Sequence, residues 1–439
     1  MFPEIRRRRL PNGVRVWTVE HRQVPLVSVL CLLPVGASAD PPDRPGLAAI
    51  AADMLDEGSG DRSALDVYEA LGRMGAQLDT DVGHDATLVS LTTLERFLQP
   101  GLDLVADMLM HPRLEQREFD RVRDLRLNRL LQLRDMPPAQ ADRAFTHLLF
   151  RNHPYGHLPL GSEGALRAMT VRELAAFHRS AFDPARMTIV LVGDATHDVL
   201  AEAAARAFGG WTPSADAPPP IDPVAAAPPP AVASRLALVH RPGAAQSELR
   251  IGQVAVSRET PDYHALLVVN MVLGGQFISR LNLKLREEKG YTYGARTAFE
   301  FRRAPGPFVF QASVQSDATT DAVRETLAEL RAIRGERPVT RQELELGRAA
   351  LTRGYPRSFE TADQIARAAA QLALYGLPDD YFSRFVPMVL ALDEAQVTRA
   401  AAAHLDPPRL LTVIVGDRDR LAPSLASLDM GDAADVAVG

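Results

Sequence analysis

One short pattern occurs twice in this chain, and it constrains the fold more than any other feature. Residues 186–194 read RMTIVLVGD and residues 409–417 read RLLTVIVGD, at an offset of 223 residues (186 to 409). An Asp-Pro turn precedes each copy, and before the turn lies a helix-patterned segment, at 171–181 or 394–404. A near-continuous apolar run is typical of a buried strand. The repeated helix, turn and strand therefore indicate two similar halves that arose by duplication.

The boundary between the halves is a segment of Pro, Ala and Ser. From Trp211 to Val232 the chain has almost no large apolar residues, and prolines stand at 213, 218–220, 223 and 228–230. Such a composition is typical of a semi-extended linker. We therefore predict domains at residues 1–212 and 233–439, joined by a linker at 213–232.

The order of elements in the first half indicates the fold class. A tight Asn-Gly turn at residues 10–13 separates two strand-like runs and predicts a hairpin. The patterns then predict a strand at 25–34, helices at 46–55 and 64–74, strands at 77–82 and 86–94, and several helices between 100 and 181. Runs of strands and of helices favour an α+β fold in which each half is a largely antiparallel sheet with helices packed on one face. The charged helical segments at 117–131 and 341–353 correspond more loosely between the halves.

Composition excludes several classes of function. The composition, with 46% hydrophobic and 24% charged residues, is typical of a soluble globular protein. The length of 439 residues is sufficient for two domains. The net charge of -6 gives no reason to expect nucleic acid as a partner. A single cysteine, Cys31, excludes a disulfide framework within the chain and a cysteine-based zinc site. No apolar stretch could span a bilayer and no signal core is present, so we expect no membrane partner and a cytoplasmic location, or a periplasmic one if the numbered chain is a processed form.

The segment at 273–295, LGGQFISRLNLKLREEKGYTYGA, concentrates the side chains that look placed for chemistry. Gly290 predicts the end of a helix, with Arg286 in its last turn and Tyr293 on the strand that follows. Tyr291 and Tyr293 would point to one sheet face, where a phenol could reach the guanidinium. These are donors suited to a peptide carbonyl and to the oxyanion that it becomes. A plainer interpretation stays open, in which Arg286 favours the helix C-terminus and Tyr291 packs on the sheet.

Four motifs in order carry a resemblance to a known family. They are GLAAIAADMLDEGS at 46–59, HPYGHLPLGSEGAL at 153–166, the Gly-Asp strand at 190–194 and SRLNLKLREEKGYTYGA at 279–295. From about Leu10 to about Arg420 the chain resembles the M16 zinc peptidases, which include pitrilysin, insulinase and the mitochondrial processing peptidase. Members of that family are built of two similar halves, as the duplication indicates here.

The resemblance implies that the zinc site is lost in this chain. The family holds zinc with His-x-x-Glu-His, in which the Glu is the general base. That motif falls here on Ala49, Ala52 and Asp53, and the third ligand, a Glu about 76 residues beyond the second His, falls on Arg129. These residues cannot supply three ligands, so we predict no metal in this chain and, as a hypothesis, an Asp53–Arg129 ion pair in the vacated site.

Two other histidine clusters were weighed as metal sites. His153 and His157 are four apart, but Pro154 and Gly156 break the helix that this spacing requires. His84, with Asp81 and Asp85, lies in a turn-rich loop where such residues are common. Neither cluster rivals the M16 motif positions.

The family's substrate-binding pair is retained. In M16 peptidases an Arg and a Tyr seven residues apart, in the second half, hold the substrate carbonyl, and they match Arg286 and Tyr293 (286 to 293). Gly274 and Gly275 match the place of the glycine-rich loop in the non-catalytic processing-peptidase subunit. Their alternative role is a tight strand-to-helix connection that needs positive φ.

The resemblance therefore implies the non-catalytic subunit of a heteromeric zinc endopeptidase. This chain would form a heterodimer with a homologous subunit that carries an intact His-x-x-Glu-His motif and the zinc, and its substrates would be peptides. An alternative is a structural scaffold subunit of a larger assembly, without a role in peptide hydrolysis. A stand-alone hydrolase has little support, because no recognisable nucleophile pattern is present.

Overall fold

The fold of the chain was analysed in a computed structural model that describes residues 2–213, 219–229 and 231–436. The elements of the first half are β1 (Arg6–Arg9), β2 (Arg15–Glu20), β3 (Leu26–Leu33), η1 (Ala37–Ala39), α1 (Leu47–Asp53), β4 (Gly58–Ser59), β5 (Arg62–Ser63), α2 (Ala64–Met74), β6 (Gln77–Val82), β7 (Thr87–Leu94), η2 (Glu95–Phe97), α3 (Leu98–Met110), α4 (Gln116–Arg134), α5 (Pro137–Phe150), α6 (Glu163–Ala168), α7 (Val171–Ala181), β8 (Thr188–Gly193) and α8 (His197–Phe208). The predicted hairpin is formed by β1 and β2, and the helix predicted at 64–74 has the same bounds in the structure.

The second half repeats much of this order. Its elements are β9 (Leu236–His240), β10 (Gln246–Val254), α9 (Tyr263–Leu273), α10 (Arg280–Asn282), the π-helix η3 (Leu283–Glu288), β11 (Thr292–Phe299), β12 (Pro307–Gln315), η4 (Ser316–Ala318), α11 (Thr319–Ala332), α12 (Arg341–Thr352), η5 (Tyr355–Phe359), α13 (Ala362–Tyr375), α14 (Tyr381–Ala391), α15 (Glu394–His404), η6 (Pro407–Arg409), β13 (Leu411–Gly416), α16 (Arg418–Leu425), η7 (Ala426–Leu428) and β14 (Ala434–Asp435).

The proline-rich segment between the halves forms no helix or strand where it is described. Residues 213, 219–229 and 231–232 carry only turns, bends and irregular backbone. The remaining linker positions, 214–218 and 230, lie outside the described residues. The division of the chain at 213–232 stays a prediction.

The two sheets have the same topology in five of their six strands. The first sheet has the order β1-β2-β8-β3-β7-β6, and the second has the order β14-β9-β13-β10-β12-β11. In each sheet the repeated Gly-Asp strand, β8 or β13, pairs in parallel with one neighbour and antiparallel with the other. The remaining shared pairs, β3 with β7 with β6 and β10 with β12 with β11, are antiparallel. This confirms the α+β fold of two similar, largely antiparallel sheets.

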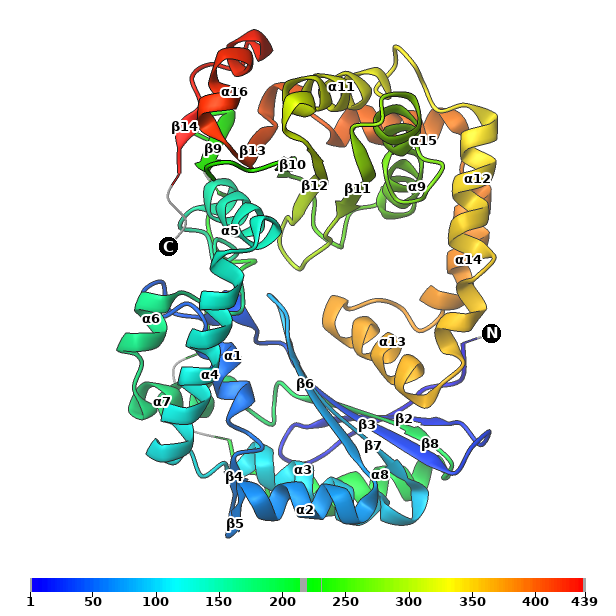
Figure 1. The fold of residues 1–439 in the computed structure, drawn as a ribbon. Coiled ribbons are helices and arrows are strands. Elements are labelled where there is room, and N and C mark those ends of the chain that lie inside the picture. Colours follow the sequence, from blue (N-terminus) through cyan, green and yellow to red (C-terminus); the bar gives the residue numbers. More distant parts are fainter. Residues whose placement is uncertain (1, 214–218, 230, 437–439) are drawn as a thin grey trace. The chain divides into compact units, whose positions relative to one another are not determined.

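The first compact unit consists of residues 1–130, 158–223 and 356–383. In Figure 1 its sheet lies between α13 on one face and a layer that includes α2, α3 and α8 on the other. Helix α13 comes from the second half of the sequence, yet it packs on β3 and β8. Ala366 and Ala369 of α13, three residues apart on the helix, are fully buried, and such small side chains let a helix lie close to a sheet.

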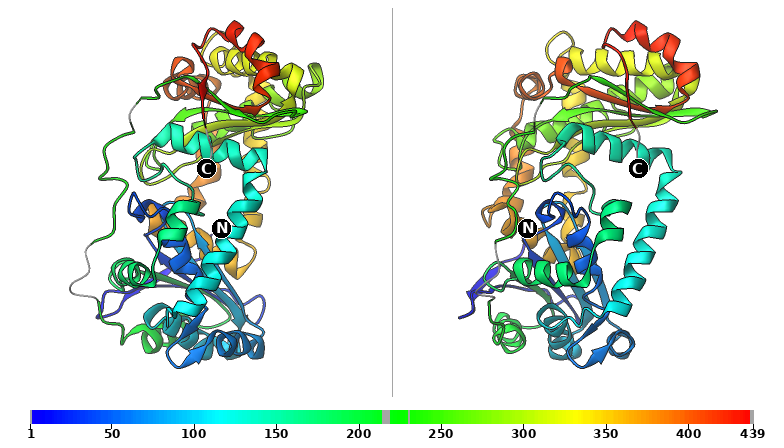
Figure 2. Two further views of the ribbon diagram at one scale, coloured as in Figure 1. Left: turned by 60° about the vertical axis from the view of Figure 1, so that its left-hand side comes forward. Right: turned by 90° about the vertical axis from the view of Figure 1, so that its left-hand side faces the viewer.

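The second compact unit consists of residues 131–157, 224–355 and 384–439. Its sheet is covered on one face by the cyan helix α5, which comes from the first half, and on the other by a layer that includes the yellow α11 and the red α16 (Figure 2). Helix α5 approaches closely at Gly252 of β10, where an added Cβ would lie 2.8 Å from Phe145 Cζ. Each sheet is therefore covered on one face by a helix that comes from the other half of the sequence, α13 on the first sheet and α5 on the second.

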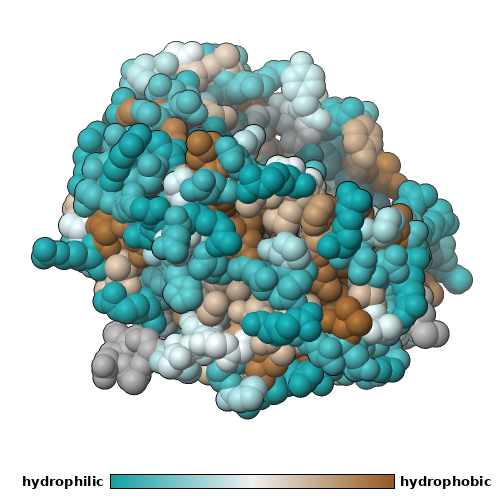
Figure 3. Space-filling view, turned by 90° about the horizontal axis from the view of Figure 1, so that it is seen from below, coloured by the Kyte–Doolittle hydropathy of each residue, from teal (hydrophilic) through white to brown (hydrophobic). Residues whose placement is uncertain are grey.

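The outward surface of the first unit is mainly hydrophilic. Figure 3 shows polar side chains over most of this face, with small scattered hydrophobic patches.

Helix α2 begins at a capping box of Ser63 and Asp66 and ends at Gly75, whose φ is 57°, so its bounds follow from local signals. Among the residues that the structure describes, no helix combines the length and the apolar character needed to cross a membrane.

Candidate functional site

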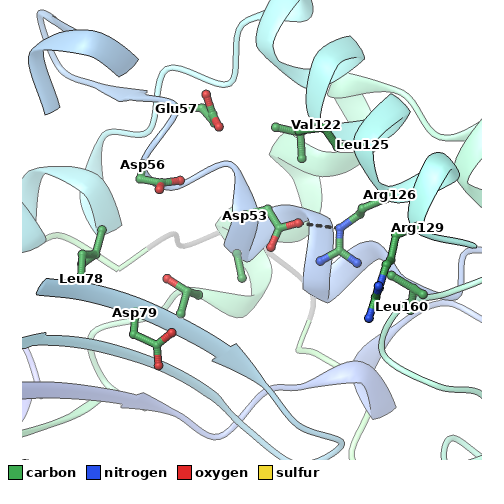
Figure 4. A pocket seen from close by; sticks show the side chains of 12 residues that line it. Asp53, Asp56, Glu57, Leu78, Asp79, Val122, Leu125, Arg126, Arg129 and Leu160 are labelled. Carbon is green, nitrogen blue, oxygen red and sulfur yellow. Dashed lines mark hydrogen bonds and ion pairs between the residues drawn. The ribbon is translucent and has the colours of Figure 1, made fainter. Parts of the chain in front are cut away.

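Three of the four positions that match the zinc motif, Ala52, Asp53 and Arg129, line a cavity in the first unit. Helix α1 carries Ala49, Ala52 and Asp53, and α4 carries the position of the third ligand. The cavity has a volume of about 480 Å³. Figure 4 shows its lining, which comes from α1, β6 and α4 and from the segments that follow α1 and precede α6: Ala52, Asp53, Asp56, Glu57, Leu78, Asp79, Thr80, Val122, Leu125, Arg126, Arg129 and Leu160.

The donor set at these positions does not fit zinc. Ala49 and Ala52 are 3% and 2% exposed, and each presents only a methyl group. Catalytic zinc needs three protein ligands from nitrogen, oxygen or sulfur donors. Within 2–213, 219–229 and 231–436, no three His, Cys, Asp or Glu side chains are grouped so that they could hold a metal ion. We therefore assign no metal chemistry to this cavity.

Asp53 forms an ion pair with Arg126 of α4, while the hypothesised pair of Asp53 with Arg129 stays a prediction. Its Oδ2 accepts a hydrogen bond from Arg126 Nε at 2.6 Å (Figure 4). The Arg126 side chain is 12% exposed and that of Asp53 is 41% exposed. Arg129 lies one turn further along α4 and lines the same cavity. At the position that matches the second His of the motif, the side chain is thus an aspartate paired with an arginine of α4.

Two acidic residues after α1 were not singled out from the sequence. Asp56 and Glu57 follow α1 directly and line the cavity. Partial removal from water and the neighbouring Glu57 and Asp53 carboxylates raise the pKa of Asp56 to about 6. Glu57 forms an ion pair with Arg121 of α4. The Asp-Glu pair inside the first motif was the signal that could have identified them.

The segment that carries Arg286 in the second unit forms an unusual helix. Instead of the predicted α-helix, α10 is a single turn and continues as the π-helix η3. The wider turns appear in the backbone, where Lys289 N donates to Lys284 O at 3.1 Å and Tyr291 N donates to Leu285 O at 2.8 Å. Gly290 ends the helix with φ 65°, as predicted. Short π-helical segments are rare and occur frequently at functional sites.

Arg286 is held by an aromatic ring. Its guanidinium carbon lies 3.9 Å from the centroid of the Phe277 ring, and its side chain is 31% exposed. Nη1 lies 3.4 Å from Glu287 Oε1, but it is buried and makes no hydrogen bond within the described residues. A planar cation over an aromatic face keeps its N–H groups in the plane, where they remain able to donate. One donor nitrogen of Arg286 is therefore left without a hydrogen-bond acceptor among the described residues.

Tyr293 is displayed by an irregularity in an edge strand. The register of β11 against β12 shifts between Thr292 and Ala295, so Tyr293 and Gly294 lie outside regular pairing. The side chain of Tyr293 is 93% exposed. Such bulges re-aim side chains and are common beside active sites. Tyr293 lies on the strand as predicted, whereas Tyr291 precedes it, so the simple alternation expected for these two residues does not apply.

The two glycines before this segment serve close packing. They connect α9 to α10, two helices, and the φ of Gly274 is -159°, an extended value that any residue adopts. The expectation of a strand-to-helix turn with positive φ was wrong. An added Cβ would lie 2.6 Å from Thr297 N at Gly274 and 2.8 Å from Asn270 Nδ2 at Gly275. The absence of a side chain therefore lets this loop lie against β11 and α9.

The HPYGH motif has a structural role in the second unit. His153 is 8% exposed, and its Nδ1 accepts a hydrogen bond from Tyr155 N at 3.1 Å. Burial lowers the pKa of His153. Tyr155 is fully buried, and its hydroxyl accepts a hydrogen bond from Ala304 N at 3.1 Å. The motif thus anchors the end of α5, which agrees with its interpretation as a structural signature.

Comparisons with family models and with curated proteins agree with the geometry. The model described as Insulinase (Peptidase family M16) matches residues 15–161, and the model described as Peptidase M16 inactive domain matches residues 168–351. An uncharacterised zinc protease of Mycobacterium tuberculosis is 26% identical over 372 residues, 84% of each chain. A probable mitochondrial-processing peptidase subunit beta of Arabidopsis thaliana is 24% identical over 281 residues, 62% of this chain and 51% of that protein.

Solved structures share the fold over nearly the whole chain. A peptidase M16 inactive domain from Pseudomonas fluorescens matches with a TM-score of 0.85 and 24% identity, over 94% of this chain and 98% of that one. A protease from Helicobacter pylori matches with a TM-score of 0.85 and 19% identity, over 95% and 100%. Two family models in sequence order, the duplicated sheets and these structures lead to one conclusion: the chain belongs to the M16 peptidase family.

Proposed function

We propose that this chain is the non-catalytic subunit of a heteromeric M16 zinc endopeptidase. Its partner would be a homologous chain with an intact His-x-x-Glu-His motif, which would hold the zinc. Arg286 and Tyr293 of this chain would complete the partner's site, where peptides are hydrolysed.

One contrast within the chain carries the proposal. At the zinc-motif positions the side chains are two buried methyl groups and an aspartate in an ion pair. At the substrate-binding positions, Arg286 keeps a buried Nη1 without a hydrogen bond and Tyr293 is 93% exposed. Donors that stabilise an oxyanion contribute to catalysis only where a peptide bond is attacked. Because this chain lacks the zinc ligands, the retained pair favours a role in another subunit's reaction.

The chemistry assigned to the pair is electrostatic. The Arg286 guanidinium would donate to the carbonyl oxygen of the peptide bond and orient it for attack. The Tyr293 hydroxyl would donate to the oxyanion that forms on that oxygen, and negative charge there makes the hydrogen bond stronger. Donors aimed at developing charge lower the barrier because they stabilise the transition state more than the bound substrate.

The name of one relative supports a subunit role. The Arabidopsis thaliana protein is described as a subunit of a processing peptidase. That description concerns the relative, and we extend it to this chain as part of the proposal.

Mixing experiments test the proposal directly. This chain and an M16 homologue with an intact motif would be purified separately and co-expressed, and peptide cleavage and zinc content would be measured for each chain and for the pair. We expect no cleavage and no zinc for this chain alone, and cleavage by the pair. Stoichiometric zinc and cleavage by the single chain would refute it.

The same pair distinguishes the scaffold alternative. A variant with both Arg286→Lys and Tyr293→Phe keeps the size of each side chain. We expect it to assemble with the partner and to lose most of the cleavage rate. Undiminished cleavage by the assembled double variant would favour a scaffold.

A further inference from the structure

Tyr293 lies on β11, an edge strand whose backbone is hydrogen-bonded to a side chain on its free side. In the second sheet β11 pairs with β12 on one side only. The free side of an edge strand normally presents unpaired backbone N–H and C=O groups. At Ala295, the first residue after the bulge, both groups are bound by one side chain.

That side chain is Asn282, the last residue of α10. Its Oδ1 accepts a hydrogen bond from Ala295 N at 2.9 Å, and its Nδ2 donates to Ala295 O at 2.7 Å. The amide thus takes the place of a neighbouring strand at this single residue. Asn282 is 6% exposed, so these bonds are protected from water.

The remaining contacts of Asn282 join two further segments. Its Nδ2 lies 3.1 Å from Ser279 Oγ at the start of α10 and 3.2 Å from Gln276 O in the loop after the two glycines. One buried amide therefore connects that loop, the helix that leads into Arg286, and the strand residue just beyond Tyr293. Because an amide NH₂ group has two N–H donors, Nδ2 can serve Ala295 O and one of the other two acceptors at a time.

The other end of the bulge is fixed by Thr292. Its Oγ1 lies 2.7 Å from Ser313 O on β12 and 2.9 Å from Gly294 O, and it accepts a hydrogen bond from Gly294 N at 3.1 Å. Tyr293 thus stands between two fixed points, Thr292 on one side and Ala295 on the other. Its side chain is exposed while its backbone is held.

We infer that Asn282 is a positioning residue that fixes the bulged segment bearing Tyr293 relative to the helix bearing Arg286. The effect on catalysis rests on the proposed function, whereas the effect on the segment does not. Asn282 lies four residues before Arg286, and its bonded partner Ala295 is two residues after Tyr293. The amide therefore ties the helix to the strand beyond the bulge, whereas the Tyr291 N–Leu285 O hydrogen bond joins the helix to the strand before the bulge.

Hydrogen exchange on the full-length chain tests the positioning role without a partner subunit and without a peptide-cleavage assay. In the unmodified chain the Ala295 amide is expected to be protected although it faces the free edge of the sheet. In Asn282→Ala and Asn282→Asp, exchange of the peptide covering 292–296 should rise about five- to tenfold, while that of 307–315 on β12 stays unchanged. Asp keeps the size but replaces the donor with an oxygen facing Ala295 O.

A matched control is Asn12→Ala. Asn12 also makes two hydrogen bonds to backbone carbonyls through Nδ2, with Phe208 at 2.8 Å and Trp211 at 3.0 Å, but in the first unit. It should leave exchange of 292–296 unchanged. An unprotected Ala295 amide in the unmodified chain, or equal exchange in the Asn282 variants, would overturn the inference.

Kinetics of the reconstituted pair separate this inference from the proposed function. If Asn282 positions Tyr293, Asn282→Ala lowers kcat with little change in KM, and combining it with Tyr293→Phe adds less than the product of the two single effects. A pair in which Tyr293→Phe lowers kcat but Asn282→Ala does not would reject the positioning role. A pair in which Tyr293→Phe itself has no effect would reject the proposed function and leave the exchange measurement to decide on Asn282.

Discussion

Asp53 of α1 and Arg126 of α4 form a hydrogen-bonded ion pair of 2.6 Å beside the cavity where M16 peptidases hold zinc. The Asp53 carboxylate, the one oxygen donor at the motif positions, is therefore hydrogen-bonded to the Arg126 guanidinium. The Arg126 side chain is only 12% exposed, so water stabilises its positive charge less than it stabilises that of a surface arginine. The Asp53 carboxylate therefore contributes more to the stability of this charge.

The ion pair should stabilise the first unit. Asp53→Ala leaves the largely buried Arg126 side chain without this acceptor and is expected to lower the free energy of unfolding by about 1–3 kcal/mol. Urea unfolding of the chain measures the change. Glu163→Gln is a suitable control because its ion pair with Arg167 is exposed, and such pairs contribute about 0.5 kcal/mol or less. Equal effects of the two substitutions would contradict a special role for the pair.

Removal of metal should distinguish this chain from its partner. A ligand that binds the native state raises the midpoint of thermal unfolding, Tm. We expect neither EDTA nor added zinc to shift Tm of this chain, while EDTA abolishes cleavage by the reconstituted pair. A rise in Tm with zinc that saturates at one ion per chain would show that the cavity does bind metal.

Asp56 gives the chain a pH dependence of known sign. Its pKa is raised in the folded state from the ordinary 3.8 to about 6, so between these values the folded state binds more protons than the unfolded state. Stability from this group is therefore present at low pH and is lost as pH rises through about 6. Asp56→Asn should stabilise the chain at pH 7.5 and have little effect near pH 4. Asp124→Asn, at an exposed carboxylate on α4, is the control, and unfolding in urea at both pH values is the measurement.

The close approach of α5 to the second sheet predicts a marked difference between two glycines. In Gly252→Ala the added Cβ would lie 2.0 Å from Phe308 O and 2.8 Å from Phe145 Cζ, so we expect a loss of about 2–3 kcal/mol or more. Gly72 in α2 has nothing within 4 Å of such an atom, and Gly72→Ala should stabilise by about 0.5–1 kcal/mol. Thermal unfolding of both variants provides the comparison. A Gly252→Ala chain as stable as the unmodified one would show that β12 and α5 do not approach Gly252 this closely.

Local sequence signals predicted most of the fold. The Asn-Gly hairpin, the capped helix at Ala64–Met74 and the two Gly-Asp strands follow from turn chemistry and from runs of apolar residues. The exchange of α5 and α13 could not be read in the same way. An amphipathic helix has the same pattern whichever sheet it covers, and the choice between two similar sheets is made by tertiary packing.

The candidate site contains contacts that a count along the chain does not predict. The pairing of Asp53 with Arg126 is one of them, because Arg126 and Arg129 are three apart on α4 and both line the cavity. The π-helix at Leu283–Glu288 has residues ordinary for an α-helix, because the two differ in hydrogen-bond offset and not in composition. The shift of register that displays Tyr293 likewise depends on side-chain bonds from Thr292 and Asn282 that no periodicity reveals.

If this chain supplies Tyr293 to a zinc site in another subunit, replacing that one hydroxyl should slow peptide cleavage. We would measure kcat of the reconstituted pair in which only this chain carries Tyr293→Phe. Tyr68→Phe is the matched control, because Tyr68 on α2 is also exposed, to 75%. We expect Tyr293→Phe to lower kcat by about 100- to 1,000-fold and Tyr68→Phe to leave it unchanged. An unchanged kcat in a correctly assembled Tyr293→Phe pair would show that Tyr293 does not act at the zinc site.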